Sequence, residues 1–145
     1  MIKIVKYEKA KADIHFVRDN VFIKEQGISR ELEYDGLDPG SYHVVVWDEV
    51  GNPLGTGRIS RAGHIGRLAV LKDQRHKGIG RSILRALIAK ARELGMKKVD
   101  LNAQSHAVSF YKKLGFEEKG HPFYEANIPH LRMIKCLPRE STSSG

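Results

Sequence analysis

The stretch from Leu68 to Leu84, LAVLKDQRHKGIGRSIL, constrains the fold more than any other part of the chain. An apolar run suited to a strand leads through a polar loop with two glycines, Gly78 and Gly80, into an amphipathic helix. Glycine lets a backbone come close to a ligand, and the first N–H groups of a helix have no internal partners. Because the helix dipole adds positive potential at that end, the stretch predicts a strand–loop–helix unit with an anion site.

Neither of the two familiar phosphate loops matches this stretch. The pattern GxxxxGK[ST] is absent, and the dinucleotide pattern GxGxxG would need a third glycine where the chain has Ile83. A single G-x-G before a helix also serves turn geometry alone, so the loop by itself leaves phosphate binding and plain turn chemistry open. The cations that surround it are Lys72, Arg75, Lys77 and Arg81.

Hydrophobic periodicity divides the rest of the chain into alternating elements. Helical spacing predicts helices around residues 14–22, 79–94 and 107–114, which end before Gly27, Gly95 and Gly115. The early strands suit antiparallel hairpins, whereas the strand–helix–strand unit pairs in parallel through a right-handed crossover. The predicted fold class is α/β, with a mixed α+β sheet. Its strands are predicted over residues 2–7, 43–48, 53–60, 64–71, 99–103, 116–119 and 131–137.

Length and composition add further limits. With 145 residues, 41% of them hydrophobic, the chain suits one domain, expected over residues 1–137, before a tail over 138–145 that is expected to be disordered. No apolar run reaches the roughly 18–20 residues of a membrane span, and the N-terminus lacks the apolar stretch of a secretory signal. The single cysteine, Cys136, excludes an internal disulfide and is expected to be a small buried hydrophobic residue. A reduced, cytoplasmic protein without a metal is expected.

The formal net charge of +8 is unevenly distributed. Residues 25–38 hold five acids and one base, a net charge of −4, so the rest of the chain carries +12. This split predicts two electrostatic surfaces, one suited to anions and one to cations. The positive excess, with a basic run over residues 72–92, also suits nucleic acid, but no helix-turn-helix, zinc-finger or RNP pattern is present, so weak and salt-sensitive binding at most is expected.

Two segments, in this order, resemble the GNAT superfamily of acyl-CoA-dependent N-acyltransferases. Residues 75–80, R-x-x-G-x-G after a strand that ends in LAV, look like its R/Q-x-x-G-x-G/A pyrophosphate loop. Residues 102–116, NAQSHAVSFYKKLGF, look like its N-x-x-A-x-x-L/F-Y-x-x-x-G-F segment. The segments VFIKEQGI and IPHLRMIK, together with His43, extend the resemblance to the bacterial YjcF-like branch over nearly the whole chain.

The resemblance implies a twisted sheet of six or seven strands with helices on both faces. The strands through residues 68–70 and 99–103 would splay apart, and the pantetheine of acetyl-CoA would lie between them against backbone groups of Leu68 and Val70. A backbone N–H near Leu68 and Ala69 would stabilise the oxyanion of the reaction. The pyrophosphate would bind, without a metal, to Arg75, His76, Lys77, Gly78, Ile79, Gly80 and Arg81.

The resemblance also assigns Tyr111 as the acid that protonates the leaving CoA thiolate. A phenol, with a pKa of about 10, stays protonated at neutral pH. From the residues alone, Tyr111 lies on the apolar stripe of its helix and fits a core aromatic residue as well. The superfamily often has Asn where this chain has Gln104, so a contact with the cofactor is expected from Gln104 or from Asn102.

A second departure concerns the general base. Many members of the superfamily carry a Glu where this chain has Gly66, and an ammonium must lose a proton before it can attack. For every candidate a structural role is the other interpretation: the acids as a solvated loop, the histidines as satisfied structural groups. The candidates are Glu25, Glu33, Asp35, His43, His64 and His130, or an ordered chain of water molecules.

The expected function is transfer of an acetyl group from acetyl-CoA directly to a primary amine of a small molecule or peptide. In the resemblance the acidic segment borders the acceptor, so that Glu25, Glu33, Asp35 and His43 would meet a cationic amine. The missing Glu motivates an alternative, a CoA-binding module with little or no catalysis. The acceptor and the acyl-chain preference stay open, and a homodimer, which the superfamily often forms, is allowed.

Overall fold

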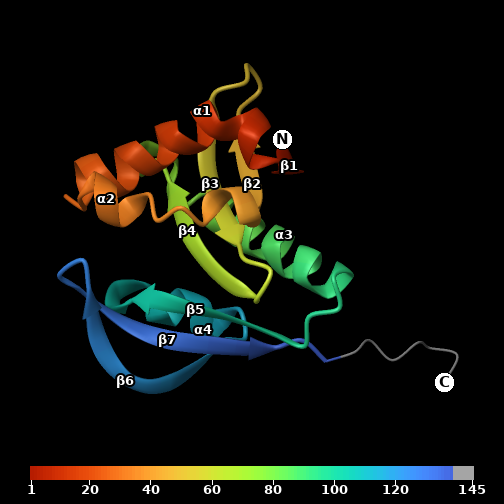
Figure 1. Ribbon diagram of the computed structural model, residues 1–145, viewed down its shortest axis with the longest axis vertical. Helices are drawn as coiled ribbons and strands as arrows, with labels where there is room; N and C mark the ends of the chain where they lie inside the picture. The colour runs from red at the N-terminus through yellow and green to blue at the C-terminus, as the bar shows by residue number, and fades with distance from the viewer. Residues whose placement is uncertain (139–145) are drawn as a thin grey trace, which may run out of the picture.

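The computed structural model describes residues 1–138 and contains one seven-stranded sheet with the strand order β1-β2-β3-β4-β5-β7-β6 (Figure 1). Of the tail expected over 138–145, residues 139–145 lie outside the described residues. No helix within 1–138 is long and apolar enough to cross a membrane. The strands are β1 (Ile2–Val5), β2 (Tyr42–Trp47), β3 (Pro53–Ile59), β4 (His64–Val70), β5 (Lys98–Gln104), β6 (Glu117–Glu125) and β7 (Ile128–Cys136). The helices are α1 (Tyr7–Arg18), η1 (Asp19–Glu25), α2 (Arg30–Glu33), η2 (Asp38–Gly40), η3 (Lys72–Gln74), α3 (Ile79–Glu93), η4 (Ser105–Ala107) and α4 (Val108–Lys113).

Every strand pair is antiparallel except β4 with β5, which α3 connects. The parallel pairing is short, because it joins only His64 to Asp100 and Ile65 to Leu101. Beyond Ile65 the two strands diverge, and Figure 1 shows the gap between their C-terminal ends. The expected splay of these strands is confirmed, and it opens the sheet at the end where β4 leads into the glycine loop.

Helices cover both faces of the sheet, as expected (Figure 1). Successive residues of β2 show this directly: Val44 belongs to the core under α3, and Val45 packs against α1. The apolar stripe of α3 is buried from Ile83 to Ala91. Gly57 of β3 allows this close packing, because a Cβ there would lie 2.8 Å from the Cγ2 of Ile83.

Three expectations about local structure are corrected. The first helix is not α-helical up to Gly27, because after Arg18 it continues as the π-helical segment η1. Strands β6 and β7 are each nine residues long, longer than expected, because β6 is almost entirely exposed and β7 mixes exposed with buried residues, so that their apolar pattern is weak. Cys136 is exposed rather than buried, since it lies at the end of β7.

Candidate active site

A β-bulge interrupts β4 where it leaves β5. Thr56 of β3 pairs with Ala69, and Arg58 pairs with Gly66, so the single residue between them on β3 faces Arg67 and Leu68 on β4. Arg67 takes the left-handed conformation, with φ at +52°. A bulge leaves a residue without a ladder partner and bends its strand. It therefore turns the backbone of residues 67–68 out of the ladder, at the mouth of the gap between β4 and β5.

The side chain of Arg67 holds this bulge against the acidic segment. Its Nε and Nη2 donate to the carbonyl oxygen of Glu33 at 3.1 and 2.9 Å, and Nη2 also donates to that of Leu32 at 3.2 Å. The guanidinium pairs with the carboxylates of Glu33 at 3.2 Å and Asp35 at 3.3 Å. Because a left-handed arginine is strained, these contacts show what keeps it in place.

The carboxylates of the acidic segment are neutralised by arginines from other elements. Arg18 of α1 pairs with Glu33 at 2.7 Å and with Asp38 at 2.6 Å, and it is fully buried. Arg58 of β3 pairs with Asp38 at 2.8 Å and also with Asp35. The expected separate surface for cations is therefore wrong for most of this segment. The ion-pair network, which is buried at Arg18, Glu33, Asp38 and Arg58 and reaches the surface at Arg67 and Asp35, consists of these six residues.

Acid should weaken this network, so the free energy of unfolding should fall between about pH 4 and pH 2. Burial alone would raise the pKa of Asp35, but hydrogen bonds from Arg58 and from the backbone of Leu37 outweigh it and lower the pKa to about 2. An unfolded Asp has a pKa of about 3.9. The stabilisation is therefore complete above about pH 4 and is lost as the pH falls through about 2. Urea unfolding across this range measures it.

Asp35→Asn is the matched variant for this acid prediction, because it removes the titrating group and keeps the side chain's size. Its free energy of unfolding should fall less than that of the wild type between pH 4 and pH 2. Parallel losses in the two proteins would contradict the assignment to Asp35.

His43 lies inside the same region rather than on a surface. Its side chain is buried, and its Nε2 donates to the carbonyl oxygen of Asp38 at 2.9 Å. Burial lowers the pKa of His43. The imidazole is thus neutral and braces η2. The prediction that Glu33, Asp35 and His43 contact the amine remains untested, and their present partners are protein groups.

The glycine loop after β4 has the shape of an anion cradle. His76 and Gly78 both have positive φ, +65° and +83°, and α3 begins at Ile79. At the N-terminus of α3, the N–H of Ser82 donates to the carbonyl oxygen of Gly78. Alternating left-handed residues before a helix start make a concavity lined by N–H groups. The cations Lys77 and Arg81 are exposed beside it.

Arg75 is held by η1. Its two terminal nitrogens each donate to the carboxylate of Glu25 at 2.6 Å, and its Nε donates to the carbonyl oxygen of Val70 at 3.0 Å. The guanidinium therefore ties the loop to the end of β4, and its charge is matched by Glu25. Hydrogen bonding to Arg75 lowers the pKa of Glu25, which makes this carboxylate a poor proton acceptor.

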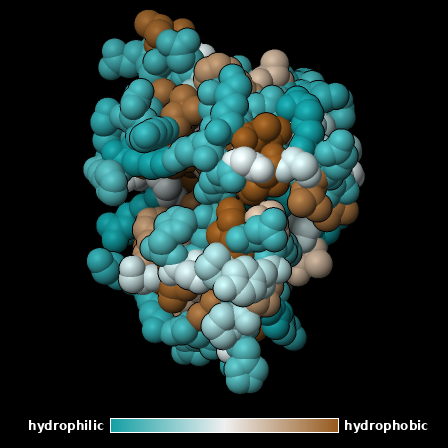
Figure 2. All heavy atoms as spheres, turned by 90° about the vertical axis from the view of Figure 1, so that its left-hand side faces the viewer, coloured by the Kyte–Doolittle hydropathy of each residue, from teal (hydrophilic) through white to brown (hydrophobic). Residues whose placement is uncertain are grey.

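Gln26, which follows Glu25 at the end of η1, reaches across to β5. Gln26 and Gln104 exchange two amide hydrogen bonds, at 3.2 and 2.9 Å, across 78 positions of sequence. Gln104 and Asn102 both lie on the face of β5 opposite to Leu101 and Ala103, which are in the core. Nothing in the sequence pattern indicated Gln26. Figure 2, which views the side where β4 and β5 diverge, shows apolar side chains near the middle of this face with hydrophilic ones around them.

Tyr111 of α4 belongs to the core on the face of the sheet that α3 covers. Only 9% of it is exposed, and its ring packs edge-on against Phe110 and Phe116 with centroids 5.1 and 5.8 Å away. Within residues 1–138 its hydroxyl makes no hydrogen bond with the protein. Burial raises the pKa of Tyr111 to about 12. The phenol is therefore a protonated donor without a partner.

Two histidines of the sheet differ in what their nitrogens contact. His130 is buried on β7, its ring stacks on Phe123, and its Nδ1 donates to the carbonyl oxygen of Ile128 at 2.7 Å. His64, at the start of β4, has a half-exposed side chain, and its Nδ1 lies 2.9 Å from the Oδ1 of Asp100.

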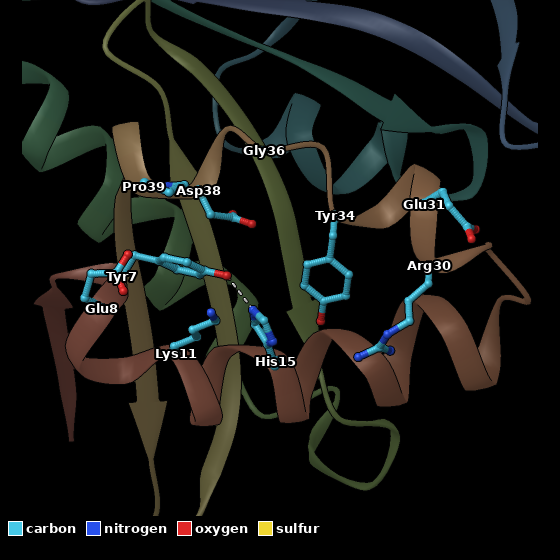
Figure 3. A pocket seen from close by; sticks show the side chains of 10 residues that line it. All are labelled: Tyr7, Glu8, Lys11, His15, Arg30, Glu31, Tyr34, Gly36, Asp38 and Pro39. Carbon is cyan, nitrogen blue, oxygen red and sulfur yellow. Dashed lines mark hydrogen bonds between the residues drawn. The ribbon is translucent and has the colours of Figure 1, made fainter.

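A pocket of about 580 Å³ lies between α1 and the segment 30–39, and its lining residues include none from β4 or β5 (Figure 3). Tyr7 and Tyr34 lie on two sides of His15, and a hydrogen bond of 2.5 Å joins the hydroxyl of Tyr7 to the Nε2 of His15. Asp38 lines the pocket and connects it through Arg58 to the ion-pair network. No pattern in the sequence indicated this group. The lining residues are Tyr7, Glu8, Lys11, His15, Arg30, Glu31, Tyr34, Gly36, Asp38 and Pro39.

Comparison with known proteins agrees with this geometry. Residues 6–137 match the family model for the acetyltransferase (GNAT) domain. The uncharacterized N-acetyltransferase YjcF of Bacillus subtilis is 41% identical over 136 residues, which cover 91% of this chain and 96% of YjcF. An acyl-CoA N-acyltransferase structure from Pseudomonas aeruginosa is 25% identical with a TM-score of 0.82, covering 94% of this chain and 99% of that one.

A more distant structure shares the fold alone. An aminoglycoside 6'-N-acetyltransferase solved with coenzyme A has a TM-score of 0.77 at 15% identity, covering 97% of this chain and 99% of that one. The family model and the relative at 41% identity both span nearly the whole chain. The chain therefore belongs to the GNAT family of acyl-CoA-dependent N-acetyltransferases.

Proposed function

We propose that this chain transfers the acetyl group of acetyl-CoA directly to a primary amine of a small molecule or peptide. One observation carries the proposal: β4 leaves β5 after Ile65, has its bulge at Arg67, and ends in the glycine loop before α3. The bulge, the free strand edge and the loop thus follow one another along a single strand. Their order matches the acyl group, the pantetheine and the pyrophosphate of acetyl-CoA.

Each part has a chemical task in this proposal. Amide N–H groups of the loop from Arg75 to Arg81 would bind the pyrophosphate, with Lys77 and Arg81 adding charge. Backbone groups of Leu68 and Val70 would hold the pantetheine amides, which Gln104 or Asn102 would meet from the opposite strand. The backbone N–H turned out by the bulge, at Leu68 or Ala69, would stabilise the oxyanion that forms on the acyl carbonyl.

The roles of several expected residues change within the proposal. Arg75 and Glu25 would brace the loop rather than bind a phosphate or an amine, because each fully occupies the other. Glu33, Asp35 and His43 would position β4 through Arg67 and Arg58. Tyr111 would protonate the CoA thiolate as it leaves.

Thermal-shift titration tests the cofactor part, with acetyl-CoA, CoA and ATP in parallel. Both CoA species should raise the unfolding midpoint by mass action, and ATP should not. An equal shift with ATP would show that the loop is only a general basic surface and not a site for CoA. Release of free thiol with a panel of primary amines then tests transfer.

Two glycines at opposite ends of α3 supply matched variants for this titration. Gly78 and Gly95 have φ of +83° and +77°, and a Cβ at either would meet nothing within 4 Å. Substitution by alanine should therefore lower the free energy of unfolding by the same amount at both positions, about 1 kcal/mol. Only Gly78→Ala should weaken acetyl-CoA binding, by about tenfold or more, because its Cβ would stand in the open space where a phosphate approaches the loop amides. A hydrogen bond to a charged group that is lost in this way costs about 1.5–3 kcal/mol. Equal affinities of the two variants would contradict the assigned loop.

The second candidate function is a CoA-binding module with little or no catalysis. Gly66 favours it, because a Cβ there would meet nothing within 4 Å and the position offers no proton acceptor. Tight binding of acetyl-CoA with thiol release no faster than the reaction in buffer would support this alternative. Amine-dependent thiol release would exclude it.

A further inference from the structure

We propose that His64 is the general base that takes the proton of the acceptor amine, and that Asp100 is the residue that positions it. This inference rests on the proposed function, because it concerns the same reaction. It supplies a proton acceptor that Gly66 cannot provide.

The fold places His64 at the point where the two strands begin to separate. It pairs with Asp100, and the parallel pairing ends one residue later, at Ile65. Ile65 and Leu101 are buried in the core under α3. Since strand side chains alternate between faces, His64 and Asp100 both lie on the opposite face, as does Gly66. Gly66 has no side chain, and a Cβ there would meet nothing within 4 Å, so the position between His64 and the bulge on this face is open.

The hydrogen bonds of His64 fix which nitrogen is free. Arg132 of β7 donates from Nη2 and Nε to the Oδ2 of Asp100 at 2.7 and 3.2 Å. Burial would raise the pKa of Asp100, but the bonds from Arg132 and His64 outweigh it and hold the pKa below its usual range. A charged carboxylate only accepts hydrogen bonds, so the Nδ1 of His64 donates its proton to Oδ1. The lone pair of Nε2 is left for the substrate.

The other candidates for the base are occupied. His43 uses its Nε2 on a carbonyl oxygen and is buried. His130 is buried under Phe123, with its Nδ1 on a carbonyl oxygen and its Nε2 3.8 Å from the Oε2 of Glu125. Glu25, Glu33 and Asp35 are paired with arginines. In His64, 46% of the side chain is exposed, and Nε2 has no hydrogen-bond partner among residues 1–138.

The proton balance is complete with these groups. The Nε2 of His64 takes one proton from the ammonium, and the neutral amine forms a C–N bond with the acyl carbon. The carbonyl electrons move to oxygen, return as the C–S bond breaks, and leave on the CoA sulfur, which takes the proton of Tyr111. The amide nitrogen loses its second proton, which restores Tyr111 through solvent, and His64 releases its own to water. The products are one amide, one thiol and one proton in excess.

Bromoacetyl-CoA tests the placement of His64 without a known acceptor. Its α-carbon lies next to the acyl carbon, so a facing Nε2 forms an N–C bond there and displaces bromide. Trypsin then releases the modified histidine in the peptide of residues 62–67, AGHIGR. The exposed thiol of Cys136 is first removed as Cys136→Ser. We expect the adduct at His64, suppressed by excess CoA, and less of it at the exposed His121, unaffected by CoA.

Variants of Asp100 separate positioning from folding. Asp100→Asn keeps an oxygen that accepts from Nδ1 and should retain labelling, whereas Asp100→Ala should reduce it severalfold with unchanged binding of CoA. With any amine that turns over, His64→Gln should lower kcat by about 100-fold and leave the KM for acetyl-CoA unchanged. Absence of the adduct at His64 in a protein that CoA stabilises would overturn the inference alone. Absence of any stabilisation by CoA would overturn the proposed function, and the inference with it.

Discussion

Tyr111→Phe should lower kcat for acetyl transfer by about 100-fold and leave the KM for acetyl-CoA nearly unchanged, because general acid catalysis contributes about 10²–10⁴ in rate. The substitution removes one oxygen from a ring packed between Phe110 and Phe116 and leaves that packing in place. Within residues 1–138 the hydroxyl has no protein partner, so no hydrogen bond is lost on mutation. The effect should fall on the chemical step alone.

The measurement is steady-state thiol release with an amine found in the panel, together with thermal unfolding. Tyr124→Phe is the control, because Tyr124 is 77% exposed on β6 and should change neither kcat nor stability. Since burial raises the pKa of Tyr111 to about 12, the wild-type rate should show no loss of this acid as the pH rises to about 10. If Tyr111→Phe kept the wild-type kcat, Tyr111 would be a core aromatic residue and not the acid.

Arg18→Ala should lower the free energy of unfolding by about 3–5 kcal/mol, because it removes one partner from a buried ion pair and leaves the others uncompensated. Arg18 is fully buried and pairs with both Glu33 and Asp38. Without it, two carboxylates of the acidic segment would lie inside the protein with fewer positive partners. The loss should shrink in mild acid, where protonation neutralises them.

Urea unfolding at pH 7 measures this loss, and Arg30→Ala is the control. Arg30 pairs with Asp19 at 3.1 Å, but its side chain is 59% exposed. Exposed pairs are screened by water and contribute little, so this variant should unfold like the wild type. Equal stability of Arg18→Ala and Arg30→Ala would show that the network contributes nothing to folding.

Local patterns in the sequence determined most of the frame. The apolar stripe of α3 and the glycine before it were readable because helical spacing and a left-handed backbone are properties of adjacent residues. The parallel pairing of β4 with β5 followed from the strand–helix–strand order, because a helical crossover joins parallel strands. The splay and the family came from two motifs in the correct order, at residues 75–80 and 102–116. The predicted ranges of β6 and β7 were too short, because β6 is almost entirely exposed and the apolar alternation of β7 is weak.

The tertiary structure alone decided what the candidate site residues contact. Glu25 was expected near an amine and Arg75 near a phosphate, yet they bind each other across 50 positions. The acidic segment was expected to attract cations, yet arginines from α1, β3 and β4 neutralise it. His64 and Asp100 meet across 36 positions. Such pairs depend on where the sheet brings distant residues together, and periodicity along the chain carries no information about that distance. The sequence thus determined which elements form, and only their packing decided which charges remain free for chemistry.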